Sequence, residues 1–150
     1  MIIPVLEGDI REVSPSVLAY VGDAVFELYV RLHLAARIHS KSGALHRQAI
    51  VFVRAEAQAR AARSMLDSFS EEEASVFRRA KNSNPTSLAK NASPADYKYA
   101  TGLEAVIGYL YLTDQNARLD EVLRRILIEE TNGSGEGERN GKGSETKSLH

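Results

Sequence analysis

The chain has 150 residues, a length typical of one domain, and we expect no second full-sized domain. Its net charge of −1 gives no overall electrostatic reason to expect a nucleic-acid or membrane partner, and the lack of cysteine excludes disulfides, thiol nucleophiles and cysteine-ligated metals. No uncharged run approaches the roughly 18 apolar residues of a membrane helix, and the N-terminus does not resemble a signal peptide, so we expect a cytoplasmic protein without a membrane partner.

Two long helices are predicted in the first half of the chain. Ser14 and Pro15 suit the N-cap and first position of a helix that continues to Ala36. This helix is apolar almost all round, which predicts a central buried helix. A second helix is predicted from near Ser42 to Leu66, and its solvent-facing side should carry four arginines, Arg47, Arg54, Arg60 and Arg63.

The next predicted helix begins with a capping box. Ser70 and Glu73 have the spacing at which each side chain caps a backbone amide of the other, and the helix should end near Asn82. Residues 83–93 then predict a loop. Their composition, rich in Asn and Ser, gives no helical pattern.

Two more helices complete the predicted fold. Ser93 and Pro94 repeat the cap-and-proline pair, and the helix that follows should be buried as far as Tyr111. A last amphipathic helix is predicted at about residues 117–130. We therefore expect an all-α helical bundle over residues 1–131, followed by a disordered Gly/Ser/charged tail over residues 132–150.

Two carboxylates, Asp23 and Glu104, lie among apolar neighbours on the helices predicted to be most buried. An ionised carboxylate is costly to bury without a counter-charge, hydrogen bonds or a metal ion. Each acid could instead face a crevice or pair with an arginine. Two acids in similar settings favour a shared divalent cation, because oxygen ligands on converging helices hold magnesium.

Glycines accompany both acids, with Gly22 before Asp23, and Gly102 and Gly108 on either side of Glu104. A glycine within a helix indicates close helix packing or the close approach of a ligand. Either alternative allows the two acid-bearing helices to come together.

At these residues the sequence resembles the ribonuclease III catalytic domain. The segment Tyr20-Val21-Gly22-Asp23-Ala24 matches the second half of that family's Glu-x-x-Glu-Phe-Leu-Gly-Asp-Ala signature. Residues 101–112, Thr-Gly-Leu-Glu-Ala-Val-Ile-Gly-Tyr-Leu-Tyr-Leu, resemble its second motif, Asp-x-x-Glu-Ala-Leu-Ile-Gly followed by apolar residues. The resemblance covers roughly residues 14–128, and the two motifs in order are more specific than either alone.

Within that family the sequence is most similar to Mini-ribonuclease III, the short form without a double-stranded-RNA-binding domain. This similarity rests on residues 18–31, 71–74, 78–82, 90–91 and 97–101, and on the short chain. The sequence departs from the full-length family at Ser16, Ala19 and Thr101, where that family has acidic residues. Only Asp23 and Glu104 carry over as catalytic and metal-binding residues.

The resemblance implies a homodimeric endoribonuclease that cleaves double-stranded RNA and leaves 5′-phosphates, with each subunit cutting one strand. It implies that Asp23 and Glu104 hold Mg²⁺, with Mn²⁺ as the expected substitute, to polarise the scissile phosphate, activate water and stabilise the leaving 3′ oxygen. It also implies maturation of the large-subunit (23S) ribosomal RNA precursor. A catalytically inactive RNA-binding or ribosome-associated module of the same fold is the alternative, and a helical interaction domain without an RNA role is a third.

Two segments are basic despite the balanced total charge. Residues 31–63 carry seven basic residues and one acidic residue, and residues 78–98 carry five and one. The first segment could be a solvated helix face, and the 83–93 loop could be a plain connector. Because double-stranded RNA is bound mainly through its backbone, we predict RNA contacts from the second segment, at Arg78, Arg79, Lys81, Lys90 and Lys98.

Glu27 and three histidines are predicted to have structural rather than catalytic roles. Glu27 lies four residues before Arg31, which predicts an ion pair along the helix rather than a metal ligand. The histidines His33, His39 and His46 have no clean ligand spacing and are expected to be surface or packing residues.

Overall fold

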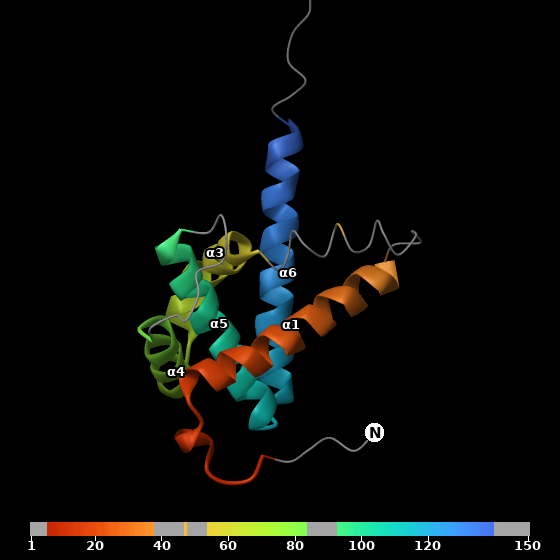
Figure 1. The fold of residues 1–150 in the computed structure, drawn as a ribbon. Helices are drawn as coiled ribbons and strands as arrows, with labels where there is room; N and C mark the ends of the chain where they lie inside the picture. The colour runs from red at the N-terminus through yellow and green to blue at the C-terminus, as the bar shows by residue number, and fades with distance from the viewer. Residues whose placement is uncertain (1–5, 38–46, 48–53, 84–92, 140–150) are drawn as a thin grey trace, which may run out of the picture.

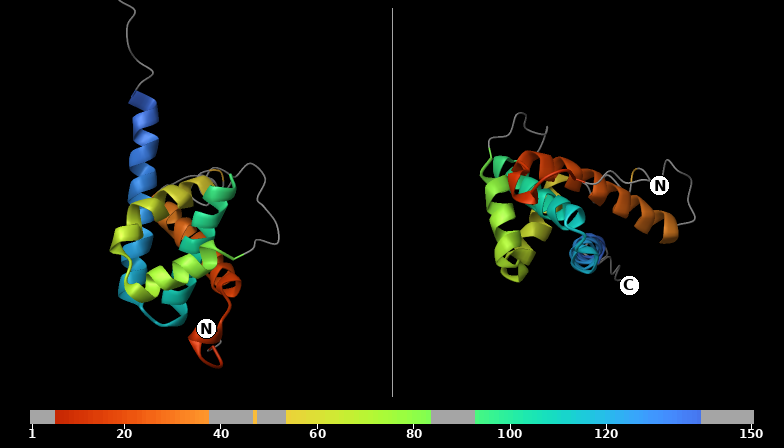
Figure 2. Two further views of the ribbon diagram at one scale, coloured as in Figure 1. Left: turned by 90° about the vertical axis from the view of Figure 1, so that its left-hand side faces the viewer. Right: turned by 90° about the horizontal axis from the view of Figure 1, so that it is seen from below.

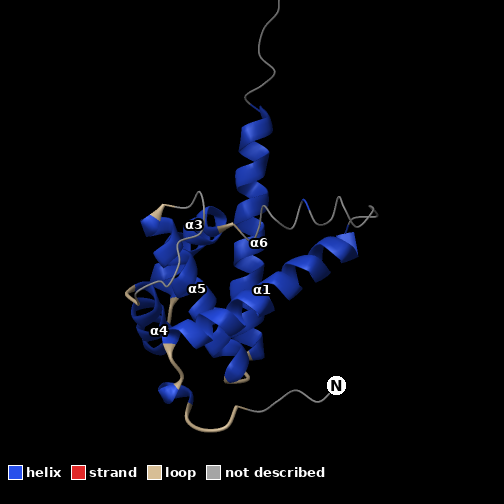
Figure 3. Ribbon diagram, in the orientation of Figure 1, coloured by secondary structure: helices blue, strands red, loops and turns tan. Residues whose placement is uncertain are grey.

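The computed structural model describes residues 6–37, 47, 54–83 and 93–139, and in these ranges all regular structure is helical (Figure 3). This confirms the all-α prediction for the described part of the chain. The longer helices are α1 (Pro15–Arg37), α3 (Ala55–Met65), α4 (Glu71–Lys81), α5 (Pro94–Leu112) and α6 (Asn116–Arg139). Short 3₁₀ turns, η1 (Ile10–Glu12) and η2 (Leu66–Ser68), precede α1 and α4.

Local sequence signals place the starts of α4 and α5. The Ser70 hydroxyl accepts a hydrogen bond from the Glu73 amide at 3.1 Å, and the Ser70 amide donates to the Glu73 carboxylate at 3.2 Å. Ser93 caps α5 by accepting from the Asp96 amide at 3.1 Å, with Pro94 at the first helical position. Both predicted caps are confirmed, because the side chains satisfy amides that have no partner within the helix.

Helix α5 is buried, as predicted, and it occupies the centre of the fold (Figure 1), where the sequence pattern had placed α1. Helix α1 crosses one side of α5, α3 and α4 lie against another, and α6 packs against its C-terminal part (Figure 2). The hydrophobic core is built largely around α5 from residues of all five long helices, among them Phe26, Leu34, Met65, Phe77, Leu103, Ile107, Leu110, Val122 and Ile126.

Helices α1 and α5 touch backbone to backbone at their crossing. A Cβ atom on Gly22 would lie 1.7 Å from the carbonyl oxygen of Glu104, and one on Gly108 would lie 2.0 Å from the carbonyl oxygen of Leu18. Only glycine fits at these two positions. Of the two interpretations of these glycines, the structure therefore supports close helix packing.

A partly buried ion pair joins the start of α4 to α6. The Nε atom of Arg118 donates to both carboxylate oxygens of Glu73 at 3.0 Å, and its Nη2 atom donates to the carbonyl oxygen of Ser68 at 2.9 Å. Glu73 is buried, so the pair compensates a charge that would otherwise be costly. This contact ties the start of α4 to α6, while the same helix α4 also contacts α1 and α5.

The prediction that α1 is buried on nearly all sides is wrong. Phe26 and Val30 are fully buried, but Tyr20, Leu28 and Leu32 are 81%, 60% and 59% exposed. The sequence pattern could not reveal this, because α5 covers one face of α1 and nothing in the described chain covers the opposite apolar face.

The second predicted helix is also not continuous to Leu66. Arg54 has an extended backbone and acts as the N-cap of α3, so the helix begins at Ala55, and Leu66 starts the turn η2. Residues 42–46 and 48–53 lie outside the described residues. The predicted solvent exposure of Arg47, Arg54, Arg60 and Arg63 is confirmed.

Helix α6 extends further than the sequence pattern indicated. It ends at Arg139 instead of near Glu130, so residues 132–139 are helical where a disordered tail was expected, and the end of α6 projects beyond the other helices (Figure 1). Extension of an established helix avoids the cost of nucleation, which offsets the weak helix propensity of the glycines. Residues 140–150 lie outside the described residues, and the division at residue 131 remains a prediction.

Candidate functional site

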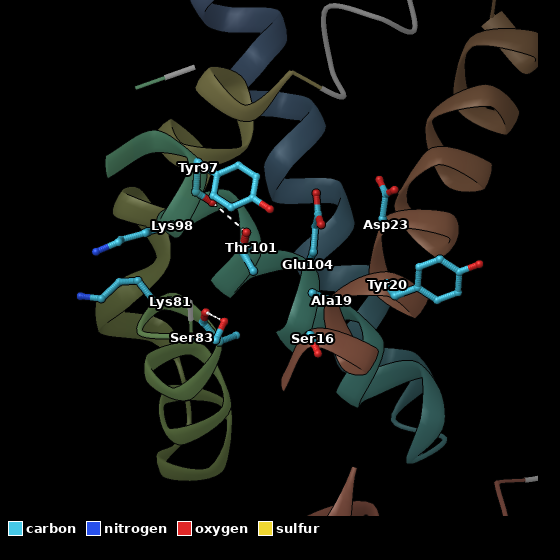
Figure 4. Close-up of a pocket in the computed structure, with 11 residues that line it drawn as sticks. Ser16, Ala19, Tyr20, Asp23, Lys81, Ser83, Tyr97, Lys98, Thr101 and Glu104 are labelled. Atoms are coloured by element: carbon cyan, nitrogen blue, oxygen red, sulfur yellow. Dashed lines mark hydrogen bonds between the residues drawn. The ribbon is translucent and has the colours of Figure 1, made fainter. Parts of the chain in front are cut away.

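An open pocket of about 380 Å³ lies between the first turns of α1, the N-terminal half of α5 and the end of α4 (Figure 4). It contains both acids that the sequence singled out. The residues that line it come from three helices: Ser16, Ala19, Tyr20 and Asp23 from α1, Ala80, Lys81 and Ser83 at the end of α4, and Tyr97, Lys98, Thr101 and Glu104 from α5.

Asp23 and Glu104 face the same space from neighbouring helices (Figure 4). Asp23 directly follows Gly22, whose missing side chain lets α1 rest on the Glu104 backbone. The helix crossing therefore sets the spacing of the two acids. Neither acid has an arginine partner in the described part of the chain, so the arginine-pair alternative receives no support there.

The two acids resist ionisation when no cation is present. The pKa of Glu104 is raised to about 8, mainly because burial disfavours the charged form and also because the Asp23 carboxylate repels it. The pKa of Asp23 is also raised, first by desolvation and then by Glu27, although much of this side chain is exposed. Both carboxylates would be stabilised by a positive charge placed between them.

Gln58 of α3 is a site residue that sequence analysis missed. Its side chain is 1% exposed, and it forms a hydrogen bond with the Glu104 carboxylate that acts to lower the pKa of Glu104. Helical spacing could have indicated it, because Gln58 lies three and seven residues before the buried Ala61 and Met65, on the same face of α3.

The three positions where the sequence departs from the full-length family also line the pocket. Ser16, Ala19 and Thr101 surround the two acids, but none supplies a carboxylate. The Thr101 hydroxyl donates to the Tyr97 carbonyl at 2.9 Å, one turn earlier in α5. No cluster of three or more acidic or histidine side chains suited to a metal occurs among the described residues.

The predicted RNA-binding residues divide into two groups. Lys81 and Lys98 line the pocket, and their side chains extend together on the side away from Asp23 (Figure 4). Arg78 and Arg79 are exposed on α4 but do not line this pocket. Lys90 lies outside the described residues.

An aromatic ring supports the cations beside the pocket. The Lys81 ammonium lies 5.2 Å from the centre of the Tyr99 ring, and the Arg63 guanidinium lies 4.5 Å from it. Arg63 also pairs with Asp96 at 3.1 Å. These contacts bring Arg63, from the first basic segment, next to the second segment.

The remaining polar residues of α1 behave as the sequence indicated. Glu27 forms an ion pair with Arg31 one turn later, which confirms the structural interpretation. His33 is half-buried on α1, and His39 and His46 lie outside the described residues.

Comparison with known proteins places this pocket in a family. The family model for the Ribonuclease III domain matches residues 16–115, which span every described residue lining the pocket. The chain belongs to the ribonuclease III family. The resemblance in residues 20–24 and 101–112 had predicted an endoribonuclease of this family, and the match confirms that prediction.

Curated relatives indicate the branch of the ribonuclease III family. A Mini-ribonuclease 3 from Clostridium tetani is 40% identical over 138 residues, which is 91% of each chain. A Mini-ribonuclease 3 from Synechocystis is 44% identical over 122 residues, covering 79% of this chain and 81% of the relative. The predicted similarity to the Mini-ribonuclease III form is confirmed.

A solved structure has the same ribonuclease III fold. A crystal structure of a protein from Fusobacterium nucleatum superposes with a TM-score of 0.75 at 27% identity, covering 83% of this chain and 99% of that one.

In the described ranges, no helix combines the length and apolar character needed to cross a bilayer.

Proposed function

We propose that this ribonuclease III-family endoribonuclease cleaves double-stranded RNA in a Mg²⁺-dependent reaction, with Asp23 and Glu104 as its catalytic and metal-binding residues. The observation that carries the proposal is the pair of carboxylates in one open pocket, with two lysines on the rim. The two carboxylates suit a cation in the pocket, and the two lysines suit RNA phosphates along its edge.

The donor set fits a hard divalent cation. Two carboxylates with raised pKa values provide oxygen ligands on converging helices, and Mg²⁺ characteristically keeps several waters and takes few protein ligands. Mn²⁺ should substitute. When bound, the ion would supply Lewis-acid activation of the phosphate and of water. The absence of acids at Ser16, Ala19 and Thr101 is therefore compatible with activity.

The protein's own groups would position the RNA. The ammonium groups of Lys81 and Lys98 would bind backbone phosphates on the α4 side of the pocket. Exposed Arg78 and Arg79 would extend the basic surface along α4, and Lys90 completes the proposed set. Asp23 and Glu104 would then face the scissile phosphate from the opposite side.

A homodimer would give one such pocket for each strand. The exposed apolar face of α1, formed by Val17, Tyr20, Leu28 and Leu32, supports this part of the proposal. Such a contiguous apolar face is typical of a protein interface, and a twofold axis would present two pockets to a duplex.

Precursor ribosomal RNA is the proposed substrate, specifically the large-subunit (23S) precursor, in the cytoplasm. The similarity to Mini-ribonuclease 3 proteins supports this choice. The inactive RNA-binding module is the second candidate, because Asp23 and Glu104 are the only acids among the residues that line the pocket in the described part of the chain, and Ser16, Ala19 and Thr101 stand where the full-length family has acids.

Cleavage of structured precursor RNA, with ends mapped, tests the proposal. Wild-type protein should cut a duplex with Mg²⁺ and not with EDTA. Asp23→Asn and Glu104→Gln should each abolish cleavage while retaining the circular dichroism spectrum and RNA affinity of the wild type.

Two outcomes would contradict specific parts of this proposal. RNA binding without cleavage by wild-type protein would favour the inactive module. Cleavage retained by both variants would overturn the site assignment.

A further inference from the structure

Gln58 is a polar side chain in a place where an apolar one would be expected. It lies on the face of α3 that packs against α5, among the buried residues Ala57, Ala61 and Met65, and is 1% exposed. Burying an amide costs about 1–3 kcal/mol unless hydrogen bonds compensate it. Apolar packing alone therefore does not explain why a glutamine occupies this buried position.

The partner of Gln58 explains its position. Its side chain hydrogen-bonds to the carboxylate of Glu104, and this contact favours the charged form of Glu104, so the amide N–H group is the donor. The bond approaches Glu104 from α3, whereas Asp23 approaches from α1. Glu104 is thus held from inside the core while it faces the pocket.

We propose that Gln58 is a positioning residue that fixes the orientation of the Glu104 carboxylate for divalent-cation binding. This inference rests on the proposed function. A glutamate side chain has three rotatable bonds, and a hydrogen bond from an amide buried in the core restricts them. Outer contacts of this kind orient metal-binding carboxylates, and their removal typically weakens metal affinity or activity about 10–100-fold.

The orientation would also leave a defined part of Glu104 for the cation. With the Gln58 amide bonded to the carboxylate from within the core, the lone pairs that this bond does not use would be available to a cation in the pocket that Glu104 shares with Asp23. In the proposed enzyme Gln58 touches neither RNA nor the ion. Its loss should therefore change cation binding and turnover without changing affinity for RNA.

The test replaces Gln58 with methionine, which has similar length and volume but no amide. Mn²⁺ titration followed by thermal unfolding, without RNA, should show stabilisation of the wild type, no stabilisation of Glu104→Gln, and at least about tenfold weaker apparent affinity in Gln58→Met. In cleavage assays at subsaturating Mg²⁺, kcat should fall by a similar factor while KM for duplex RNA stays the same.

Two further variants separate positioning from packing. Ile126→Val removes a methyl from the buried side of α6 and should lower the Tm without altering the Mn²⁺ response. Gln58→Asn keeps an amide but shortens its reach, so it should behave like Gln58→Met and provides the test if the methionine variant does not fold.

The outcomes distinguish this inference from the proposed function. If wild-type protein shows neither Mn²⁺ stabilisation nor cleavage, the proposed function fails. If wild-type protein shows both and the folded Gln58 variants match its Mn²⁺ affinity and kcat, the positioning role of Gln58 is overturned.

Discussion

Gly22 of α1 lies directly against the backbone of Glu104 in α5, so close that a Cβ at Gly22 would be 1.7 Å from the Glu104 carbonyl oxygen. Asp23 is the next residue along α1. The contact that packs the two central helices therefore also brings the two pocket acids together. Stability and site geometry depend on the same missing side chain.

Gly22→Ala should separate the two helices. A methyl group cannot fit against a main-chain carbonyl, so we expect a loss at or above the usual 1–3 kcal/mol of overpacking, or on the order of 10 °C in Tm. Cleavage should fall even at temperatures where the variant remains folded. Differential scanning calorimetry and cleavage assays measure both effects.

Ala117→Ser is the control, because Ala117 is exposed on α6, outside the pocket and outside the apolar face of α1. It should change the Tm little. A Gly22→Ala protein with wild-type Tm and activity would contradict the proposed dependence on close packing.

The pH dependence of stability should report the ionisation of Glu104. Its folded pKa is about 8, against an ordinary value of 4.5, so the unfolded chain releases this proton at lower pH than the folded protein does. In EDTA, the contribution of Glu104 to stability should be complete below about pH 4.5 and lost progressively as the pH rises to about 8. Thermal unfolding across this range measures the slope.

Two comparisons isolate Glu104 in that experiment. Glu104→Gln should flatten the slope, because it removes the titrating group. Saturating Mg²⁺ should also reduce it, because a bound cation favours the charged carboxylate. An unchanged slope in Glu104→Gln would assign the pH dependence to other groups.

Charge reversal at the pocket rim should weaken RNA binding. Lys81→Glu and Lys98→Glu should each lower affinity for a duplex, and each lost phosphate contact should reduce the salt slope of log K by about 1. Arg124→Glu on α6 is the control, because Arg124 is exposed and paired with Asp120 away from the pocket. Equal effects at all three positions, measured by fluorescence anisotropy, would indicate nonspecific attraction.

Charges on the apolar face of α1 should dissociate the proposed dimer. Leu28→Glu and Leu32→Glu should each give monomers in light scattering and lower cleavage of both strands, because the exposed apolar side chains would no longer be covered. Ile128→Glu, at an exposed apolar position on α6, should leave the mass unchanged. A wild-type mass that is monomeric at micromolar concentration would contradict this interface.

Helix boundaries were predictable where a side chain interacts with its own backbone. Ser93 with Pro94, and Ser70 with Glu73, act over three or four residues, so the sequence contains the whole interaction. The break at Arg54 carries no such signal. Neither does the end of α6, because continued extension of a helix depends on small differences in free energy.

The candidate site was predictable only in part, for the same reason. Asp23 and Glu104 were conspicuous because charged residues interrupt apolar helices. Gln58 was not, because its significance depends on Glu104, which lies far away in the sequence and meets it only after α3 packs on α5. The exposed face of α1 likewise depends on which neighbours the fold provides.

Positions that line the pocket can accommodate different side chains, whereas the glycines at the helix crossing cannot be replaced. Ser16 and Thr101 line an open hollow, so larger or charged side chains at these positions could extend into solvent rather than against backbone. At Gly22 and Gly108, by contrast, any side chain would clash with the backbone of the neighbouring helix. Evolution can therefore add or remove acids around this pocket one at a time while the helical frame stays intact, and members of one fold can differ in their number of carboxylates.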